Sequence, residues 1–316
     1  MKVAVLGATG FIGQNLVERL RKSGLGVLAC DIARPPDSQD DFMLVDVTQY
    51  DEVQNSVKEA SQVVFLAAHS LPESLVDPRR NLEVNQGGLL NVLDVLRKAG
   101  GGRLLFASAS SVYGNPPPGP VLESTACTPK TPYAVTKYAS EHYLRVFHEL
   151  YGIEYVAFRL FNVYGPGQLP QSKALIPRVL DLIMRNQEVE VFGDGSQSRD
   201  FIFVDDVSRV FENALRLDVS GEVVNLGTGQ MTSIADVVRI CGDVSGHDPR
   251  IKRLPARPGE ISNFCADTGK LRSLLQMKET TSVRDGIGKT YEWLTSLVDE
   301  KSEKTSQESS QKRKTR

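Results

Sequence analysis

The most constraining feature of the sequence lies near its amino-terminal end. An apolar run over residues 3–6 is followed by Gly7, Gly10 and Gly13 and then by apolar residues at helical spacing, which predicts a strand, a tight turn and a helix. Glycine permits positive φ and leaves no Cβ in the way of a bound group, while the first N–H groups of a helix lack partners within it. Such a helix start attracts phosphate, although a simple turn explains three isolated glycines equally well.

A carboxylate follows the second predicted strand. Asp31 ends the apolar segment 26–30 and comes 18 residues after Gly13, close to where dinucleotide-binding folds place the acid that binds the adenosine ribose. Because this carboxylate would repel a 2′-phosphate, it favours NAD over NADP. An ordinary turn residue at the end of a strand is the alternative.

The residue totals are those of a globular protein with a sizeable core. The 316 residues are 41% apolar and 24% charged with a net charge of −2, so neither nucleic acid nor a membrane surface is expected as the main partner. No apolar run reaches the roughly 18 residues of a membrane span, and no signal peptide is recognisable. The four cysteines form no CxxC pair and the histidines have no metal-ligand spacing, so we expect a reducing, cytoplasmic location and no metal.

The first half of the chain alternates strand-like and helix-like segments. This alternation predicts an α/β fold with a doubly wound, Rossmann-type parallel sheet, whose ligands bind beyond the carboxyl ends of the strands. The predicted strands cover residues 2–6, 27–30, 43–45, 63–67 and 104–107, and the predicted helices cover 11–22, 51–60 and 79–98.

Three features beyond the glycine turn are candidates for cofactor contacts. Asp46 and Val47 follow the third strand, where they could bracket an adenine or form a plain turn. The small residues after the fourth strand would let a pyrophosphate pass close to the backbone. Asn85 is polar within an apolar stretch, so it either caps a buried group or faces solvent.

A serine cluster and a tyrosine–lysine pair mark the middle of the chain. The fifth strand runs into Ser108 and Ser110, whose hydroxyls can hold a substrate, although serine clusters are usually turn formers. Thr131 caps a predicted helix on which Tyr133 and Lys137 lie one turn apart, about 6 Å on the same face. A neighbouring ammonium and a cationic nicotinamide would lower the pKa of Tyr133 from about 10 and make it a usable base.

These motifs, in this order and spacing, resemble the extended short-chain dehydrogenase/reductase superfamily and, within it, the NAD-dependent nucleotide-sugar epimerases and dehydratases of the UDP-glucose 4-epimerase type. The resemblance covers residues 1–297. It implies bound NAD, a nucleotide-diphosphate sugar as substrate, most readily a UDP-sugar, and epimerisation at C4. Tyr133 would remove the C4 hydroxyl proton, Lys137 would bind the nicotinamide ribose, and a 4-keto sugar would turn before the hydride returns to its opposite face.

The expected cofactor contacts combine these patterns with the resemblance. They are Gly7, Gly10, Phe11, Ile12, Gly13, Asp31, Asp46, Val47, Leu66, Ala67, Ala68, Asn85, Ser108, Tyr133, Lys137 and Phe161.

The second half of the chain resembles the family's substrate-binding segments. Asn162 would lie near the diphosphate, and Arg199 and Arg257 resemble two arginines that grip it, since guanidinium groups match phosphate oxygens by paired hydrogen bonds. Phe264 falls where the family's pocket meets the C2 substituent of the sugar, and Leu175 belongs to a predicted helix over residues 172–185.

The resemblance and the composition also predict the domain organisation. We expect an NAD-binding domain over residues 1–165, to which 200–220 return, and a smaller α+β substrate-binding lobe over 166–199 and 221–298. Residues 299–316 are almost devoid of apolar side chains, which predicts a disordered polar tail. A homodimer that packs through residues 79–98 and 132–151 is expected by analogy.

One position departs from the family pattern. Ala109 stands where the family usually has Ser or Thr to share the substrate proton, and Ser108 or Ser110 could substitute, with Ser110 preferred. A slow enzyme, or a catalytically weak protein that binds NAD and nucleotide-sugars, therefore stays an alternative. The family's dehydratases and decarboxylases carry a carboxylate just before Val-Tyr-Gly, where this chain has Ser110 and Ser111, so epimerisation is favoured over elimination.

Overall fold

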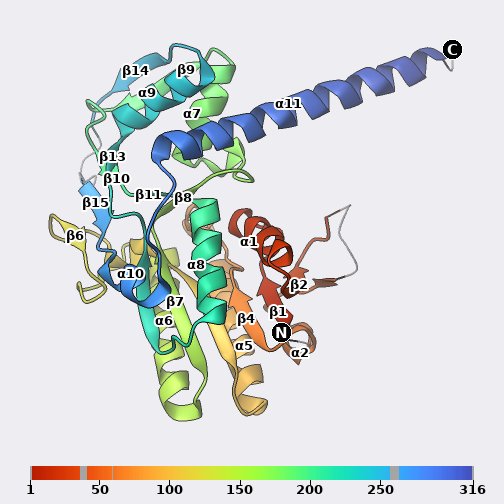
Figure 1. Ribbon diagram of the computed structural model, residues 1–316, viewed down its shortest axis with the longest axis vertical. Coiled ribbons are helices and arrows are strands. Elements are labelled where there is room, and N and C mark those ends of the chain that lie inside the picture. The colour runs from red at the N-terminus through yellow and green to blue at the C-terminus, as the bar shows by residue number, and fades with distance from the viewer. Residues whose placement is uncertain (1, 36–40, 59, 257–262, 315–316) are drawn as a thin grey trace. The chain divides into compact units, whose positions relative to one another are not determined.

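The computed structural model describes residues 2–35, 41–58, 60–256 and 263–314. Its largest element is a sheet of seven parallel strands in the order β12-β7-β5-β4-β1-β2-β3 (Figure 1). The predicted fold class, a doubly wound parallel sheet, is confirmed. The strands are β1 (Lys2–Leu6), β2 (Gly26–Asp31), β3 (Phe42–Leu44), β4 (Gln62–Phe65), β5 (Arg103–Ala109), β7 (Glu154–Leu160) and β12 (Glu222–Leu226).

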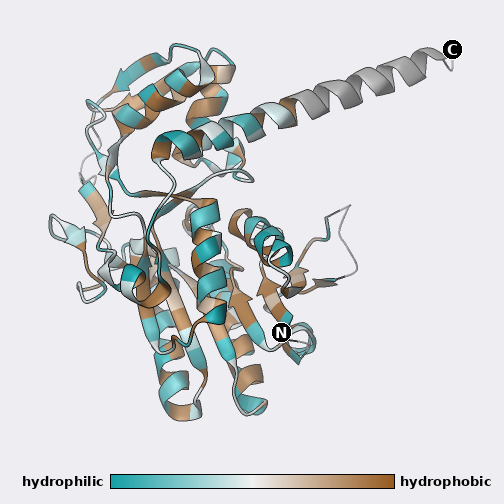
Figure 2. Ribbon diagram, in the orientation of Figure 1, coloured by the Kyte–Doolittle hydropathy of each residue, from teal (hydrophilic) through white to brown (hydrophobic). Residues whose placement is uncertain are grey.

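Helices cover both faces of this sheet. On one face, α1 (Phe11–Lys22) and α8 (Val204–Arg216) bury apolar side chains against alternate residues of β1 and β5. On the other face, α2 (Tyr50–Lys58), α5 (Gly88–Lys98) and α6 (Pro132–Tyr151) pack on the remaining residues of the same strands. The ribbon of α8 alternates between hydrophobic and hydrophilic colours in Figure 2, as expected of a helix with one buried face.

The described residues divide into two compact units. The first comprises Met1–Val163, Arg199–Met231 and Asn263–Thr280, and the second comprises Tyr164–Ser198, Thr232–Ser262 and Thr281–Arg316. Residues 221–231 and 263–280 thus belong with the sheet and not with the predicted lobe. The reason is long-range pairing: β12 forms an edge of the large sheet beside β7, with Val224 opposite Phe158, and the apolar pattern of a strand does not reveal its partner.

The second unit mixes helices and strands. Strands β9 (Glu188–Phe192) and β14 (Arg250–Leu254) pair in parallel, and α7 (Leu175–Met184) and α9 (Ile234–Ser245) pack together and against α11 (Val283–Lys314). Helix α11 continues through most of the segment predicted to be disordered. Its Lys, Glu and Gln residues are good helix formers, and extending an existing helix needs no new nucleus.

The remaining elements are short. The predicted helix over residues 79–98 is interrupted by a π-helical turn, η1 (Glu83–Gly87), between α4 (Pro78–Leu82) and α5. None of the helices in the described ranges is long and apolar enough to cross a membrane. The other short elements are α3 (Leu71–Ser74), η2 (Ser110–Tyr113), β6 (Pro120–Val121), β8 (Asn162–Tyr164), η3 (Pro170–Ser172), β10 (Ser198–Arg199), β11 (Phe201–Phe203), β13 (Thr232–Ser233), β15 (Asn263–Ala266) and α10 (Gly269–Leu275).

Candidate active site

The turn between β1 and α1 requires glycine for steric reasons. Gly7 has φ +90°, and a Cβ there would lie 2.6 Å from the backbone nitrogen of Ala67. A Cβ at Gly13 would lie 2.0 Å from the Gly7 carbonyl oxygen. Gly10 is the N-cap of α1 and has no side chain to cap the helix, so the first N–H groups of α1 are available to an anion.

Asp31 holds this turn in place. Its Oδ2 accepts a hydrogen bond from the backbone N–H of Thr9 at 2.9 Å, and its Oδ1 accepts one from Ile32 at 2.8 Å. A carboxylate has about four acceptor positions, so Asp31 can still accept hydrogen bonds from ribose hydroxyls.

Asp46 stabilises the turn after β3 by hydrogen bonds, and the adenine contact of Asp46 and Val47 stays a prediction. Asp46 accepts hydrogen bonds from the Thr48 backbone N–H at 2.9 Å and the Thr48 hydroxyl at 2.7 Å. Burial acts to raise the pKa of Asp46, but these bonds and the nearby Arg80 guanidinium lower it below its usual value. Val47 is buried and so close to α5 that a Cβ on Gly88 would lie 2.6 Å from its Cγ2.

Asn85 is buried and caps the backbone of the half-buried His69, so it does not face solvent. Its Oδ1 accepts a hydrogen bond from the His69 N–H at 2.7 Å, and its Nδ2 donates to the His69 carbonyl at 3.2 Å and to the Thr136 hydroxyl at 3.3 Å. Asn81, which the sequence analysis missed, also donates to the His69 carbonyl, at 2.9 Å. The two amides thus fix the loop after β4 to the start of α6.

Hydrogen bonding distinguishes the serines at the end of β5. Ser108 lies within β5 and Ser110 lies just beyond its last residue, so strand alternation does not relate their side chains. The buried Ser108 hydroxyl donates to Glu141 Oε1 at 2.5 Å, whereas Ser110 begins the turn η2. Ser108 is therefore already engaged inside the protein.

Tyr133 and Lys137 face one another on the first turns of α6. The Lys137 ammonium lies 5.6 Å from the centroid of the Tyr133 ring and donates a hydrogen bond to the Ala107 carbonyl, at 2.7 Å, near the end of β5. Burial lowers the pKa of Lys137 to about 7. It also raises the pKa of Tyr133 to about 12. The lower pKa predicted for Tyr133 includes the positive charge of a bound nicotinamide, so it stays a prediction.

A buried ion pair that the sequence analysis missed lies beside this helix. Glu141, one turn after Lys137, bonds to Arg159 of β7 with an Nη2–Oε2 distance of 2.7 Å, and both side chains are almost completely buried. Arg159 Nη1 also donates to the Tyr113 hydroxyl at 2.9 Å. The recurrence of Tyr133, Lys137 and Glu141 at intervals of four was the signal that could have identified Glu141.

Asp200 brings together three of the predicted substrate contacts. Its carbonyl accepts hydrogen bonds from the backbone and side-chain nitrogens of Asn162, both at 3.1 Å, and its N–H donates to the Phe264 carbonyl at 3.1 Å. Its buried carboxylate accepts from the Thr228 hydroxyl at 2.6 Å. Arg199 directly precedes it in the chain, so one buried residue orders the backbone of all three.

Phe264 is buried in an aromatic cluster. Its ring stacks on Phe161 with centroids 5.0 Å apart and meets the edge of Tyr113 at 6.4 Å. This cluster links the predicted nicotinamide and sugar contacts. Arg257, the second predicted arginine, lies outside the described residues.

Leu175 belongs to the second unit, where it lines a cavity of about 240 Å³. Apolar residues of α7, including Val179, form one part of the cavity, and Phe192 and Ile234 form another. The polar side chain of Gln197 also lines it and donates a hydrogen bond to the Phe192 carbonyl at 3.2 Å. Only Leu175 of this group was predicted.

The chain is similar to known proteins over most of its length. Residues 3–227 match the model of the NAD dependent epimerase/dehydratase family. A putative UDP-glucose 4-epimerase of Methanocaldococcus jannaschii is 31% identical over 92% of this chain and 98% of its own length.

Two solved structures resemble the fold closely. The UDP-glucose 4-epimerase of Thermotoga maritima with UDP-glucose has a TM-score of 0.88 at 28% identity and covers 94% of this chain and 100% of its own. The UDP-glucuronic acid 4-epimerase of Bacillus cereus with UDP-glucuronic acid and NAD has a TM-score of 0.85 at 30% identity, with the same coverage.

Proposed function

Because this chain belongs to the NAD dependent epimerase/dehydratase family, we propose that it is an NAD-dependent epimerase that inverts C4 of a nucleotide-diphosphate sugar through a transient 4-keto intermediate. The observation that carries the proposal is the placement of Tyr133 and Lys137, on one face of α6, against the carboxyl end of β5. Strands β5, β4 and β1 are neighbours, so this pair shares a sheet edge with the glycine turn.

The residues around the glycine turn fit a dinucleotide. A Cβ at Gly7 or Gly13 would collide with backbone atoms, and the first turn of α1, with Phe11 and Ile12, presents N–H groups to a phosphate. Asp31 would bind the adenosine ribose. Asn85 and Ser108 are hydrogen-bonded within the protein, so we assign them the positioning of neighbouring backbone. The proposed cofactor contacts also include Asp46, Val47, Leu66, Ala67, Ala68 and Phe161.

Tyr133 and Lys137 carry the proton chemistry of the proposal. Bound NAD supplies the capacity to accept a hydride from C4 and to return it. Tyr133 takes the C4 hydroxyl proton and later gives it back, and the Lys137 ammonium binds the ribose hydroxyls. Since burial lowers the pKa of Lys137 to about 7 and raises that of Tyr133 to about 12, deprotonation of Tyr133 depends on the positive charge that the bound cofactor adds.

The substrate contacts are proposed from the Asp200 group. Asn162 and Arg199 would bind the diphosphate, Arg257 would add a second guanidinium, and Phe264 would border the sugar. In the second unit, Leu175 stays a proposed substrate contact, and the cavity that it lines also holds the charged Lys173, Arg178 and Glu190.

We also propose that the protein is a cytoplasmic homodimer. Val135, Tyr143, Val146 and Leu150 are exposed and lie within one stripe of α6, which a second copy would cover. All four cysteines are free thiols, as expected in a reducing compartment.

The test is to incubate the purified protein with UDP-glucose, UDP-N-acetylglucosamine, UDP-glucuronate and dTDP-glucose and to identify the products by NMR. We expect a C4 epimer from at least one UDP-sugar, no free NADH at 340 nm, and no product with Tyr133→Phe. Elimination products would instead indicate a dehydratase or decarboxylase. Binding without turnover would support the catalytically weak alternative, which Ala109 favours.

A further inference from the structure

The position of Ala109 leaves the proposed site without its usual hydroxyl. Ala109 is the last residue of β5, and the turn η2, which starts at Ser110, follows it directly. Ser108 cannot take over this role without losing its 2.5 Å hydrogen bond to Glu141, whose carboxylate Arg159 holds in turn. The next hydroxyls along the chain are those of η2.

Within η2, Ser111 has the hydroxyl that needs a partner. Ser111 Oγ is shielded from solvent and forms no hydrogen bond with any residue that the structure describes. An unpaired buried hydroxyl is unfavourable, and buried polar groups in native proteins are normally satisfied. A ligand that binds beside η2 would supply the missing partner.

A second buried polar atom without a hydrogen-bond partner in the described ranges lies after β4, the strand next to β5. His69 Nδ1, after β4, is also without a partner among the described residues. The backbone of His69 is tied through Asn85 to Thr136, which lies between Tyr133 and Lys137 on α6. Because β4 and β5 are adjacent and parallel, both unsatisfied atoms belong to the edge where the substrate is proposed to react.

We propose that Ser111, and not Ser110, supplies the hydroxyl that Ala109 lacks. This inference rests on the proposed function. The C4 O–H bond breaks and its proton moves to the Tyr133 oxygen, while the hydride leaves C4 with its electron pair for the bound NAD. Ser111 keeps its own proton and hydrogen-bonds to the C4 oxygen as the C–O bond becomes a carbonyl. Both transfers reverse on the opposite face of the sugar.

The test compares serine variants of the NAD-loaded protein. We expect Ser111→Ala to lower kcat about 100-fold and to raise KM about fivefold, and Ser110→Ala to lose far less. In the Ser111→Ala background, Ala109→Ser should recover at least about tenfold in kcat. The thermal midpoint and NAD content of each variant control for folding. A larger loss in Ser110→Ala, or full activity in Ser111→Ala, overturns the proposal.

Binding separates failure of this inference from failure of the proposed function. If the wild-type protein turns over none of the four nucleotide-sugars, the proposed function fails. Ser111 is then tested by calorimetry with UDP-glucose and UDP. We expect Ser111→Ala to weaken UDP-glucose binding at least about fivefold and to leave UDP binding unchanged. Equal affinities of wild type and variant for UDP-glucose overturn the assignment of Ser111.

Discussion

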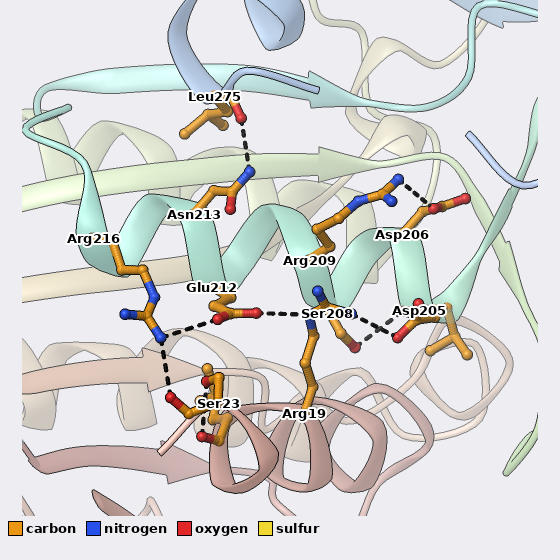
Figure 3. A network of polar contacts seen from close by, with 12 residues as sticks. Arg19, Ser23, Asp205, Asp206, Ser208, Arg209, Glu212, Asn213, Arg216 and Leu275 are labelled. Carbon is orange, nitrogen blue, oxygen red and sulfur yellow. Dashed lines mark hydrogen bonds and ion pairs between the residues drawn. The ribbon is translucent and has the colours of Figure 1, made fainter. Parts of the chain in front are cut away.

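Two networks of arginines and carboxylates in this protein have similar geometry but different surroundings. Arg159 and Glu141 approach to 2.7 Å with side chains only 6% and 5% exposed. Arg19 of α1 and Glu212 of α8 approach to 2.8 Å at 27% and 12% exposure, and Arg19 also reaches Asp205, which is 57% exposed (Figure 3). The distance between the charged atoms therefore does not tell how much each ion pair contributes to stability, because desolvation of the two side chains decides this.

The two networks also differ in the elements that they join. Burial acts to lower the pKa of Arg159, but the hydrogen bonds and charge of Glu141 outweigh it and raise that pKa. Glu141, Arg159 and Ser108 join α6, β7 and the end of β5. The surface network joins helices α1 and α8, and in both cases the joined elements also share an apolar core.

Removal of Glu141 should have the largest effect. Glu141→Ala leaves the Arg159 guanidinium buried without a counter-charge, which we expect to lower the free energy of unfolding by about 3–5 kcal/mol. Urea unfolding of the NAD-loaded protein measures this loss. Glu212→Ala is the matched control and should lose less than about 1 kcal/mol.

A double variant of the Glu141–Arg159 pair separates the loss of the ion pair from the cost of an unpaired buried charge. Glu141→Leu with Arg159→Met removes both charges, so it should recover much of the stability that Glu141→Ala loses. Equal losses in Glu141→Ala and Glu212→Ala would contradict the importance assigned to desolvation.

Lys137 provides a smaller, pH-dependent test of the cost of desolvating a charged side chain. Its pKa falls from 10.5 to about 7 on burial, so between these values the unfolded chain binds more protons than the folded protein. Stability from this group therefore rises with pH, by about 2 kcal/mol between pH 7 and 9. Urea unfolding at several pH values should show this slope in the wild type and its loss in Lys137→Met.

The pH range of this experiment is limited by the thiols. Burial raises the pKa of Cys241 from 9.0 to about 12, so the folded protein retains that proton longer and stability falls above pH 9. The difference between wild type and Lys137→Met cancels this contribution. A wild-type slope that persists unchanged in Lys137→Met would show that Lys137 is not desolvated as the structure indicates.

Sequence patterns predicted those features that depend on residues close together in the chain. The glycine turn, the strands β1 to β5 and the spacing of Tyr133 and Lys137 follow from periodicity and sequence motifs, and the resemblance joined them into one site. The pattern shows that Lys137 is the neighbour of Tyr133 on the helix, but it does not show that burial lowers the pKa of Lys137 to about 7.

Contacts between residues far apart in the chain could not be predicted from the sequence. Asp200 meets Thr228 and Ala266, which lie 28 and 66 residues further along the chain. The sheet position of β12 likewise depends on pairing with β7. In each case the residue type was visible, but its partner is fixed only by the fold.

The surface network should show the smallest effect and the greatest sensitivity to salt. A double-mutant cycle of Arg19→Gln and Glu212→Gln should give a coupling energy of less than about 1 kcal/mol, measured by urea unfolding. Because both side chains are partly exposed, this coupling should shrink between about 0.05 and 0.5 M salt, as screening shortens the range of the charges. Leu215→Ala, a buried position on the same helix, should instead lose about 2–5 kcal/mol at either salt concentration. A coupling energy that matches the buried pair, or that persists at high salt, would mean that partial exposure does not weaken the contact between α1 and α8.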